Sequence, residues 1–400
     1  MNQPSPTRPI VLLQPGRENR ARHGHPWVYA NEVVMDAAAR ALPPGEVVTL
    51  RDGFGRSLGT AIFNPHSLIV ARLLTPDPEA VIDAGFIADR LRRALAWRTR
   101  LYPQPFYRLI HAEADGLPGL VIDRLGEVVV AQLNTAGMDR LAEAVVTAIE
   151  QVLAPVAVVI QAEGGGRSLE GLAEVPRQVV RGRLDGPVVV EENGTILYAD
   201  LLAGQKTGWF FDQRDNRAFM AGLAAGSRVI DLYSYSGGFA VQCARAGATA
   251  VVAVDRSKAA LELAERSAVT NGVAGVCEFR RAEVFEELER LASAGQRFDV
   301  VIADPPAFAK SRKDVPVACR AYRKLARLSA RITAPGGFLM VGSCSHNIEP
   351  DRFGEEVALG ISGAGRNGRL LRVAGAAPDH PVHPYLPESA YLKARVFNLD

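Results

Sequence analysis

The second half of the sequence contains a cysteine and three aspartates whose types and spacing could form a reactive site. Asp231, Asp255 and Asp304 each end a short apolar run, and Cys344 follows a fourth run between two serines. A thiolate is a good nucleophile, and carboxylates accept hydrogen bonds from cationic and hydroxyl-bearing ligands. Chemistry on a bound organic ligand is therefore the first hypothesis.

The elements that must position these residues are strands and helices in alternation. After Gly226 the pattern predicts strands over residues 228–232, 250–254, 277–280, 300–303 and 338–341, with helices over 238–246, 257–271, 284–294 and 317–333. Such alternation predicts a doubly wound, Rossmann-like α/β sheet. Ligands of these sheets bind at the carboxyl ends of the strands. The three aspartates and the cysteine are thus expected at one edge of the sheet.

The turn after the first strand favours a cationic ligand. It contains Ser236 and Gly237 and opens a helix, but the Gly-x-Gly-x-x-Gly spacing of dinucleotide folds is absent. The Asp231 carboxylate would repel phosphate and would suit an ammonium or sulfonium group. Asp255, at the end of the second strand, is placed to accept ribose hydroxyls. These residues predict S-adenosylmethionine as cofactor, with S-adenosylhomocysteine as product, and no metal.

The position of Cys344 separates it from the other cysteines. It ends the fifth strand, beside the expected strand of Asp304, whereas Cys243, Cys277 and Cys319 are interpreted as core residues. Carbon-5 of a pyrimidine is a weak nucleophile until a thiolate adds to carbon-6. Asp304, followed by two prolines, is expected to form one wall of the pocket and to hydrogen-bond with the edge of the base. Cys344 and Asp304 are the candidate catalytic residues.

Charge and composition set further bounds. The net charge is only +2, but eight Lys and Arg residues stand against one Asp between Lys310 and Arg331. That helix is either a solvated face or a phosphate-binding surface, with Lys310, Arg320 and Arg323 as candidates for RNA contacts. No signal peptide and no run of eighteen apolar residues is found, so a cytoplasmic protein with no membrane partner is expected.

Changes in pattern divide the chain into three expected domains. Residues 1–75 predict a small β-rich module, and residues 76–186 predict a mixed α+β domain. Residues 187–400 form the α/β domain, with a lead-in over 187–218 that contains a hairpin turned by Asn193-Gly194.

With these residues assembled, the chain resembles the RlmI-type ribosomal RNA cytosine-5 methyltransferases over nearly its whole length. Gly24–Glu32 resembles the start of that family's PUA RNA-binding domain, and Ala114–Leu120 resembles its central domain. The most specific stretch is Gln205–Arg217, Gln-Lys-Thr-Gly-Trp-Phe-Phe-Asp-Gln-Arg-Asp-Asn-Arg. The ending from Asp379 to Lys393 is similar to the family's C-terminal signature and is expected to form a lid over the target base.

The resemblance implies a methyl transfer to cytosine in RNA, with 23S ribosomal RNA as the expected substrate. The implied cofactor residues are Lys206, Thr207, Phe210, Arg217, Asp231, Ser236, Gly237, Asp255, Glu283 and Asp304, and Cys344 is the implied nucleophile. Glu283 stands where the family usually has aspartate. The implied RNA contacts of the PUA domain are Arg22, His25 and Trp27.

Two alternatives stay open. A related methyltransferase acting on a nitrogen of guanine or another base would need no cysteine, so Cys344 discriminates against it. An RNA-binding assembly factor with a silent cofactor site is opposed by the three aspartates. The modified nucleotide, the group that removes the carbon-5 proton and the existence of a homodimer are left undetermined.

Overall fold

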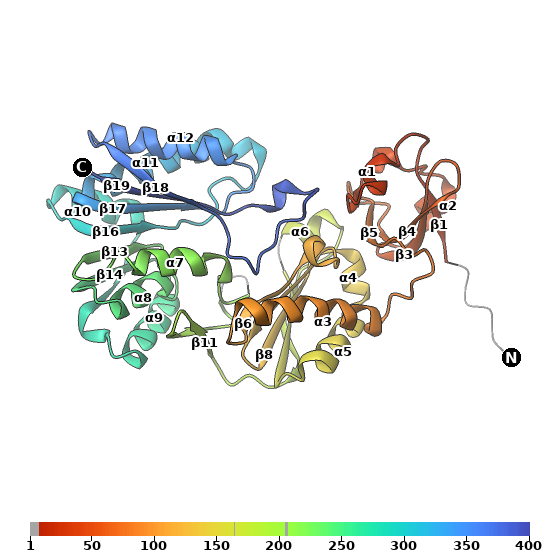
Figure 1. Ribbon diagram of the computed structural model, residues 1–400, viewed down its shortest axis with the longest axis horizontal. Coiled ribbons are helices and arrows are strands. Elements are labelled where there is room, and N and C mark those ends of the chain that lie inside the picture. Colours follow the sequence, from red (N-terminus) through yellow and green to blue (C-terminus); the bar gives the residue numbers. More distant parts are fainter. Residues whose placement is uncertain (1–7, 164, 205–206) are drawn as a thin grey trace. The chain divides into compact units, whose positions relative to one another are not determined.

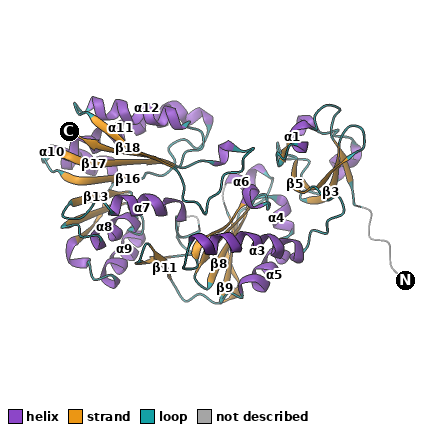
Figure 2. Cartoon of the chain, in the orientation of Figure 1, coloured by secondary structure: helices purple, strands orange, loops and turns teal. Residues whose placement is uncertain are grey.

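The computed structural model describes residues 8–163, 165–204 and 207–400. The chain forms two compact units (Figures 1 and 2). The N-terminal unit comprises residues up to Gly186, Thr207 and the segment Pro381–Pro387, and the C-terminal unit comprises Pro187–Gly204, Gly208–His380 and Glu388–Asp400. No helix in the described part of the chain is long and apolar enough to cross a membrane.

The first part of the N-terminal unit is a five-stranded sheet in the order β1-β3-β4-β5-β2. Its elements are β1 (Ile10–Leu12), α1 (Asn19–Arg22), β2 (Trp27–Val28), η1 (Ala30–Glu32), α2 (Ala37–Ala41), β3 (Glu46–Arg51), β4 (Ser57–Phe63) and β5 (Ala71–Thr75). Alternate residues of β3 and β4, including Val48, Leu50 and Phe63, fill its core. The β-rich character expected of this region is confirmed.

A second sheet follows, in the order β10-β9-β8-β7-β6. Its elements are α3 (Ala84–Leu101), β6 (Phe106–His111), η2 (Ala112–Asp115), β7 (Leu120–Leu125), β8 (Val128–Leu133), α4 (Ala136–Arg140), α5 (Ala142–Leu153), β9 (Ala157–Ala162), α6 (Gly165–Leu169) and β10 (Val175–Gly182). Ile87 and Leu91 of α3 pack with Val145 and Ile149 of α5 in the same core. The helices α4 and α5 follow one another and meet at Leu141.

The C-terminal unit is built on a seven-stranded sheet in the order β15-β14-β13-β16-β17-β19-β18. A short hairpin of β11 (Val188–Glu192) and β12 (Thr195–Ala199) precedes it. The sheet strands are β13 (Arg228–Leu232), β14 (Ala250–Asp255), β15 (Cys277–Arg281), β16 (Phe298–Ala303), β17 (Thr333–Ser343), β18 (Gly368–Ala374) and β19 (Lys393–Leu399). The first five are parallel, and β19 runs antiparallel to both β17 and β18. The doubly wound α/β sheet is confirmed.

Helices cover both faces of this sheet (Figure 1). They are η3 (Phe211–Gln213), α7 (Arg214–Ala221), α8 (Gly238–Arg245), α9 (Lys258–Thr270), η4 (Ala274–Val276), α10 (Val284–Ser293), η5 (Arg312–Asp314), α11 (Val315–Ile332) and α12 (Pro350–Gly363), and a last short turn, η6 (Pro387–Ser389), precedes β19. One core joins the sheet to α10, α11 and α12 through Leu288, Tyr322 and Phe353. The other joins it to α7 and α8 through Met220 and Phe239.

The two C-terminal strands and α12 are not predicted by the sequence patterns. Lys393, the last residue of the stretch expected to be a lid, begins β19 and is almost fully buried. Strand β19 enters the sheet between β17 and β18, and it pairs Lys393 with Ser343, which is far from it in sequence. A long-range pairing of this kind leaves no local signal beyond a short apolar run.

Candidate active site

The sheet topology brings the predicted catalytic and cofactor residues to one edge. Strand β13 lies between β14 and β16, and β16 lies beside β17. Because these strands are parallel, Asp231, Asp255, Asp304 and Cys344 lie at or just beyond their carboxyl ends. The chain order reverses between β13 and β16, and such a switch point is the usual ligand site of doubly wound sheets.

Asp231 is the most deeply buried acid of this edge, with 1% of its surface exposed. Its Oδ2 accepts a hydrogen bond from the Ala240 N–H at 3.0 Å, at the start of α8. Its Oδ1 is buried and has no hydrogen-bond partner among the described residues. Desolvation, with the nearby charges of Asp304 and Asp255, raises the Asp231 pKa to about 8 against the lowering effect of the Ala240 N–H. A buried carboxylate with one open oxygen fits a cationic ligand.

The loop between β13 and α8 is held in an unusual backbone conformation. Tyr233 and Tyr235 have φ values of +62° and +49°, a region that non-glycine residues seldom occupy. Gly237 has a φ of +78°, and a Cβ there would come within 2.7 Å of the Ala264 Cβ. The Ser236 hydroxyl is buried and has no partner among the described residues. Backbone strain and buried polar atoms without a hydrogen-bond partner often accompany a ligand site.

Asp255 fixes the same loop from the next strand. Its carboxylate accepts hydrogen bonds from the Tyr235 N–H at 3.0 Å and the Ser257 N–H at 2.8 Å. The side chain is half-buried. A carboxylate has further acceptor positions, so Asp255 can also bind ribose hydroxyls. Glu283, the candidate for the adenine contact, is exposed at the N-cap of α10 without a side-chain capping bond.

Asp304 follows β16, the strand that lies between β13 and the cysteine strand β17. Its carboxylate approaches Gly342 so closely that a Cβ on Gly342 would lie 2.5 Å from Asp304 Oδ1. Pro305 is buried and Pro306 is exposed. Phe308 packs on Tyr322 with ring centroids 4.7 Å apart. The rigid turn is therefore anchored to the core through its aromatic residue.

Cys344 is half-buried at the end of β17, between two fully buried serines. The Tyr322 hydroxyl bonds with the Ser343 hydroxyl at 2.9 Å and the Ser345 hydroxyl at 3.0 Å. Lys393 Nζ donates to the Ser345 carbonyl at 2.7 Å and to the Ile348 carbonyl at 2.9 Å. The backbone on both sides of the thiol is therefore held by buried groups.

Two of the other three thiols, those of Cys243 and Cys277, are poor nucleophiles in this structure. Cys243 and Cys319 are buried, and Cys277 is half-buried rather than buried. Desolvation raises the pKa of Cys277 to about 11 and raises the pKa of Cys243 further. A raised thiol pKa keeps the sulfur protonated at neutral pH.

The specific stretch before the sheet forms a buried polar cluster around Glu192. This carboxylate is 1% exposed and accepts from Arg217 Nη1 at 2.8 Å, Trp209 Nε1 at 3.1 Å and Gln242 Nε2 at 3.0 Å. Arg217 also donates to the Phe210 carbonyl at 2.9 Å. Arg217, a candidate cofactor residue, thus ties the β11–β12 hairpin to the sheet domain.

The other candidates in that stretch differ in position. The Phe210 ring meets the Tyr235 ring edge-on at 5.4 Å, and the Tyr235 hydroxyl donates to the Gly208 carbonyl. Phe210 therefore flanks the strained loop after β13. Thr207 is buried and belongs to the N-terminal unit. Lys206 lies outside the described residues.

The candidate RNA residues near the N-terminus are bound within the unit. Arg22 forms an ion pair with Asp52, which is fully buried. His25 is buried and bonds with Arg20, and the Trp27 indole N–H donates to Glu113 Oε1 at 2.8 Å. Desolvation opposes ionisation of Asp52, but hydrogen bonds from Arg56, the Phe54 N–H and Arg22 lower its pKa to about 2. RNA would therefore have to bind Arg22, His25 and Trp27 while they keep their contacts within the unit, or in place of those contacts.

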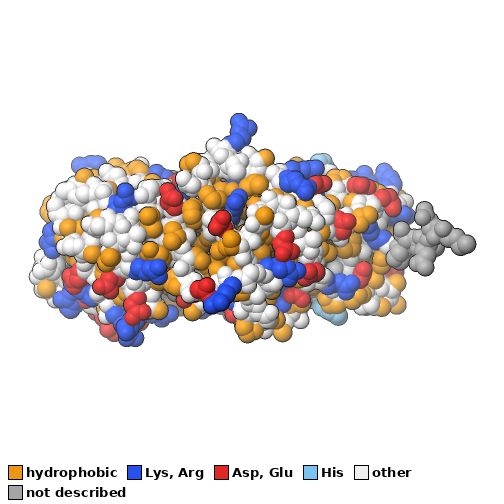
Figure 3. Space-filling model, turned by 90° about the horizontal axis from the view of Figure 1, so that it is seen from below, with side chains coloured by type: hydrophobic (Ala, Val, Ile, Leu, Met, Phe, Trp, Pro, Cys, Tyr) orange, Lys and Arg blue, Asp and Glu red, His pale blue; other side chains and the backbone are white. Residues whose placement is uncertain are grey.

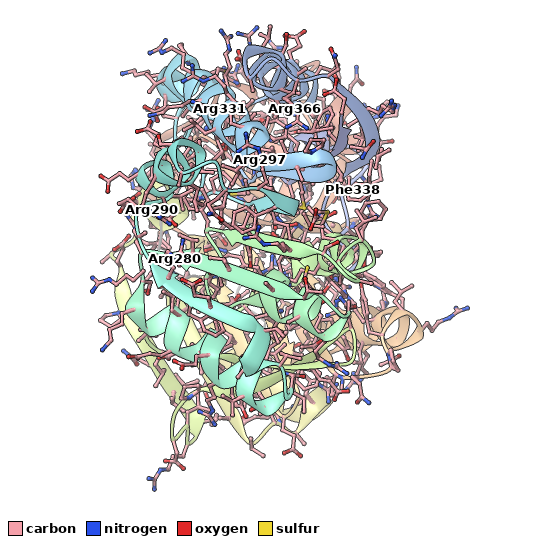
Figure 4. All side chains as sticks on the ribbon, turned by 90° about the vertical axis from the view of Figure 1, so that its left-hand side faces the viewer. Arg280, Arg290, Arg297, Arg331, Phe338 and Arg366 are labelled. Carbon is pink, nitrogen blue, oxygen red and sulfur yellow. The ribbon has the colours of Figure 1, made fainter. Side chains whose placement is uncertain are left out.

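The positive charge of the predicted basic segment, residues 310–331, is partly neutralised by acidic side chains of neighbouring helices. Arg323 binds Glu356 at 2.7 Å and Lys324 binds Glu289 at 2.9 Å, whereas Lys310 and Arg320 are exposed. Arg331 lies in the last turn of α11, just before β17 begins, at the opposite edge of the sheet from Cys344. Figure 4 labels it near Arg366. Elsewhere, on the face seen from below in Figure 3, basic and acidic side chains are interspersed. The whole helix is thus a poor candidate for one phosphate surface, and its N-terminal half is the better one.

Two sets of contacts made by the C-terminal stretch were not predicted from the sequence. The Tyr391 hydroxyl donates to Asp212, and the His346 ring stacks on the Tyr391 ring at 5.0 Å. Asp379 and His380 form a buried pair at 2.9 Å. Asp379, His380, Tyr391 and Lys393 all belong to the 379–393 stretch that the resemblance marked, whereas Asp212 and His346 lie far from it in the sequence.

Comparisons with known proteins agree with this geometry. Residues 178–397 match the S-adenosylmethionine-dependent methyltransferase family model, and residues 11–76 match a PUA-like domain. The ribosomal RNA large subunit methyltransferase I of Shewanella denitrificans is 36% identical, covering 96% of this chain and 98% of its own. That of Cronobacter sakazakii is also 36% identical, covering 96% and 97%. A solved methyltransferase structure complexed with SAH has a TM-score of 0.82 at 21% identity, covering 98% of this chain and all of its own.

Proposed function

Because the chain belongs to the family of S-adenosylmethionine-dependent methyltransferases, we propose that it methylates carbon-5 of a cytosine in large-subunit ribosomal RNA. The relatives' names support ribosomal RNA as the substrate, and the PUA-like domain supports RNA binding. The observation that carries the carbon-5 assignment is the half-buried Cys344, just after the strand that Asp304 contacts.

The buried edge of the sheet fits the family's cofactor. The open Oδ1 of Asp231 suits the methionine ammonium group, and Asp255 suits the ribose hydroxyls. Gly237 allows the loop to approach a ligand closely, and Phe210 flanks that loop. When bound, S-adenosylmethionine supplies an electrophilic methyl group.

The protein's own groups then account for activation of the base. The Cys344 thiolate would add to carbon-6 of cytosine, which makes carbon-5 nucleophilic toward the methyl group. Asp304 would hold the edge of the base, so that carbon-6 lies over the sulfur. After methyl transfer, loss of the carbon-5 proton and expulsion of the thiolate restore the aromatic ring and the free enzyme.

The decisive experiment is a covalent trap. RNA containing 5-fluorocytosine should form a stable adduct with the wild-type enzyme and S-adenosylmethionine. Release of the enzyme requires removal of the carbon-5 proton, and fluorine replaces that proton. Mass spectrometry should place the adduct on Cys344. Cys344→Ala should bind S-adenosylmethionine normally but form no adduct, whereas Cys319→Ala, at a buried thiol, should still form it.

Two outcomes would contradict the carbon-5 mechanism. Full turnover by Cys344→Ala would favour methylation of a base nitrogen, which needs no thiol. Normal cofactor binding by wild type without methyl transfer to ribosomal RNA would favour an RNA-binding assembly factor. Mapping 5-methylcytosine in ribosomal RNA from cells with and without the gene would identify the nucleotide.

A further inference from the structure

We infer that Lys393 is a positioning residue for Cys344, which fixes the turn that carries the thiol and supplies the positive charge that favours the thiolate. This inference deepens the proposed function and rests on Cys344 as nucleophile. It assigns a role to a buried lysine at the start of a strand that the sequence patterns did not predict.

The backbone geometry supports the positioning role. Lys393 pairs with Ser343 across β17 and β19, so it lies beside the residue that precedes the thiol. Its Nζ donates to the carbonyls of Ser345 and Ile348 at 2.7 and 2.9 Å. These two carbonyls bracket the turn after Cys344, and the Ile348 N–H bonds to the Ser345 carbonyl across the same turn. One ammonium group therefore closes the loop that sets the direction of the sulfur.

The charge of this lysine has few compensating partners. Its side chain is 3% exposed, and its Nζ bonds to two carbonyls, with no carboxylate in an ion pair with it among the described residues. Two carbonyl oxygens solvate the cation only in part, and a buried charge without a counter-ion is costly. A thiolate at Cys344 would supply the missing negative charge. The Lys393 ammonium binds the carbonyl of the residue next to Cys344 and interacts electrostatically with Cys344. The two ions would therefore stabilise each other in a medium of low polarity.

The surrounding titratable groups agree with this arrangement. Desolvation lowers the pKa of Lys393, whereas Cys344 and Glu349 raise it and Arg395 lowers it. On the α11 side, the Tyr322 hydroxyl faces both serines, and burial raises its pKa, so it stays neutral. The Asp304 carboxylate beside Gly342 would oppose a thiolate. Lys393 is a buried cation that binds the turn after Cys344 and would offset that repulsion.

The test separates charge from simple support of the fold. The rate of Cys344 alkylation by iodoacetamide is followed against pH by peptide mass spectrometry, in the full-length wild type and in Lys393→Met, Lys393→Arg and Lys324→Met. The midpoint should rise by about one pH unit or more in Lys393→Met, with roughly tenfold slower alkylation at pH 7. Lys393→Arg keeps the charge and should stay close to wild type. Lys324→Met changes an exposed lysine paired with Glu289 and should not move the midpoint.

Each outcome decides the inference. An unchanged midpoint in Lys393→Met, even with lost turnover, would leave Lys393 a structural residue and overturn it. An equal shift in Lys393→Arg would show that charge is not the cause and would also overturn it. If Lys393→Met does not fold, Lys393→Gln replaces it in the same comparison. Because alkylation needs no RNA, an active Cys344→Ala enzyme would refute the proposed function without affecting this measurement.

Discussion

The Asp304 carboxylate lies against the backbone of Gly342, in space that any larger residue would need. A Cβ at Gly342 would lie 2.5 Å from Asp304 Oδ1 and 3.5 Å from Asp304 Cα. Strands β16 and β17 are neighbours in the sheet, so the glycine allows the acid of one strand to sit over the end of the next. The position of Asp304 beside the Cys344 strand thus requires a residue without a side chain, glycine, at position 342.

Substitution of Gly342 by alanine should therefore displace Asp304. Turnover should fall by roughly tenfold or more, because a displaced carboxylate no longer orients the base. The effect on protein stability should be smaller. The measurement is methyl transfer to ribosomal RNA, with the melting temperature as a check on folding. Gly275→Ala is the matched control, because nothing lies within 4 Å of a Cβ there. Wild-type turnover in Gly342→Ala would show that the place of Asp304 is not critical.

Binding of S-adenosylmethionine should be coupled to loss of a proton from Asp231. The Asp231 pKa is about 8 in the free protein, so the carboxyl group is mainly neutral at pH 7 and must ionise to bind an ammonium group. Affinity should rise as the pH rises from about 6 to about 8. Calorimetry in buffers of different ionisation enthalpy should detect the released proton, and Asp231→Asn should abolish that release. Equal proton release by the wild type and Asp231→Asn would contradict this assignment.

The same group predicts how stability depends on pH. The folded pKa of Asp231 lies above its ordinary value, so the folded state holds the proton more tightly than the unfolded chain. Its contribution to stability is complete below about pH 4 and is lost as the pH rises through about 8. Unfolding by denaturant should show that Asp231→Asn is stabilised relative to wild type most strongly at about pH 8. A stability difference that stays constant between about pH 5 and about pH 8 would argue against the raised pKa.

Loss of the Asp255 carboxylate should weaken cofactor binding. Asp255→Ala removes charge-assisted hydrogen bonds worth roughly 1.5 to 3 kcal/mol, which corresponds to about a ten- to hundredfold loss of affinity. The Kd for S-adenosylmethionine is the measurement. Asp255→Asn should lose less, since the amide oxygen can still accept from the Tyr235 N–H. An unchanged Kd in Asp255→Ala would remove the residue from the cofactor site.

RNA binding should depend more on Arg320 than on Arg323. Arg320 is exposed, whereas Arg323 is held by Glu356, so Arg320→Ala should lower affinity and reduce the salt dependence by about one phosphate contact. Arg323→Ala should leave affinity nearly unchanged, because Glu356 still pairs with Arg352. Titration of ribosomal RNA fragments at several salt concentrations compares the two. A greater loss from Arg323→Ala would contradict this order.

The sequence alone determined the parts of this protein whose signals are local. Alternating apolar runs predicted the parallel strands, and an acid or a cysteine at the end of a run marked Asp231, Asp255, Asp304 and Cys344. Parallel strands carry their ligands at one edge, so these residues could be grouped from the strand pattern.

Tertiary structure alone decided which groups surround those residues. The antiparallel insertion of β19 places Lys393 beside Ser343, a residue far earlier in the chain. Arg217 forms an ion pair with the buried Glu192 of the β11–β12 hairpin. Arg22 likewise forms an ion pair with a buried acid, Asp52. Burial and long-range pairing set these contacts, and both depend on how distant segments pack rather than on the spacing of residues along the chain.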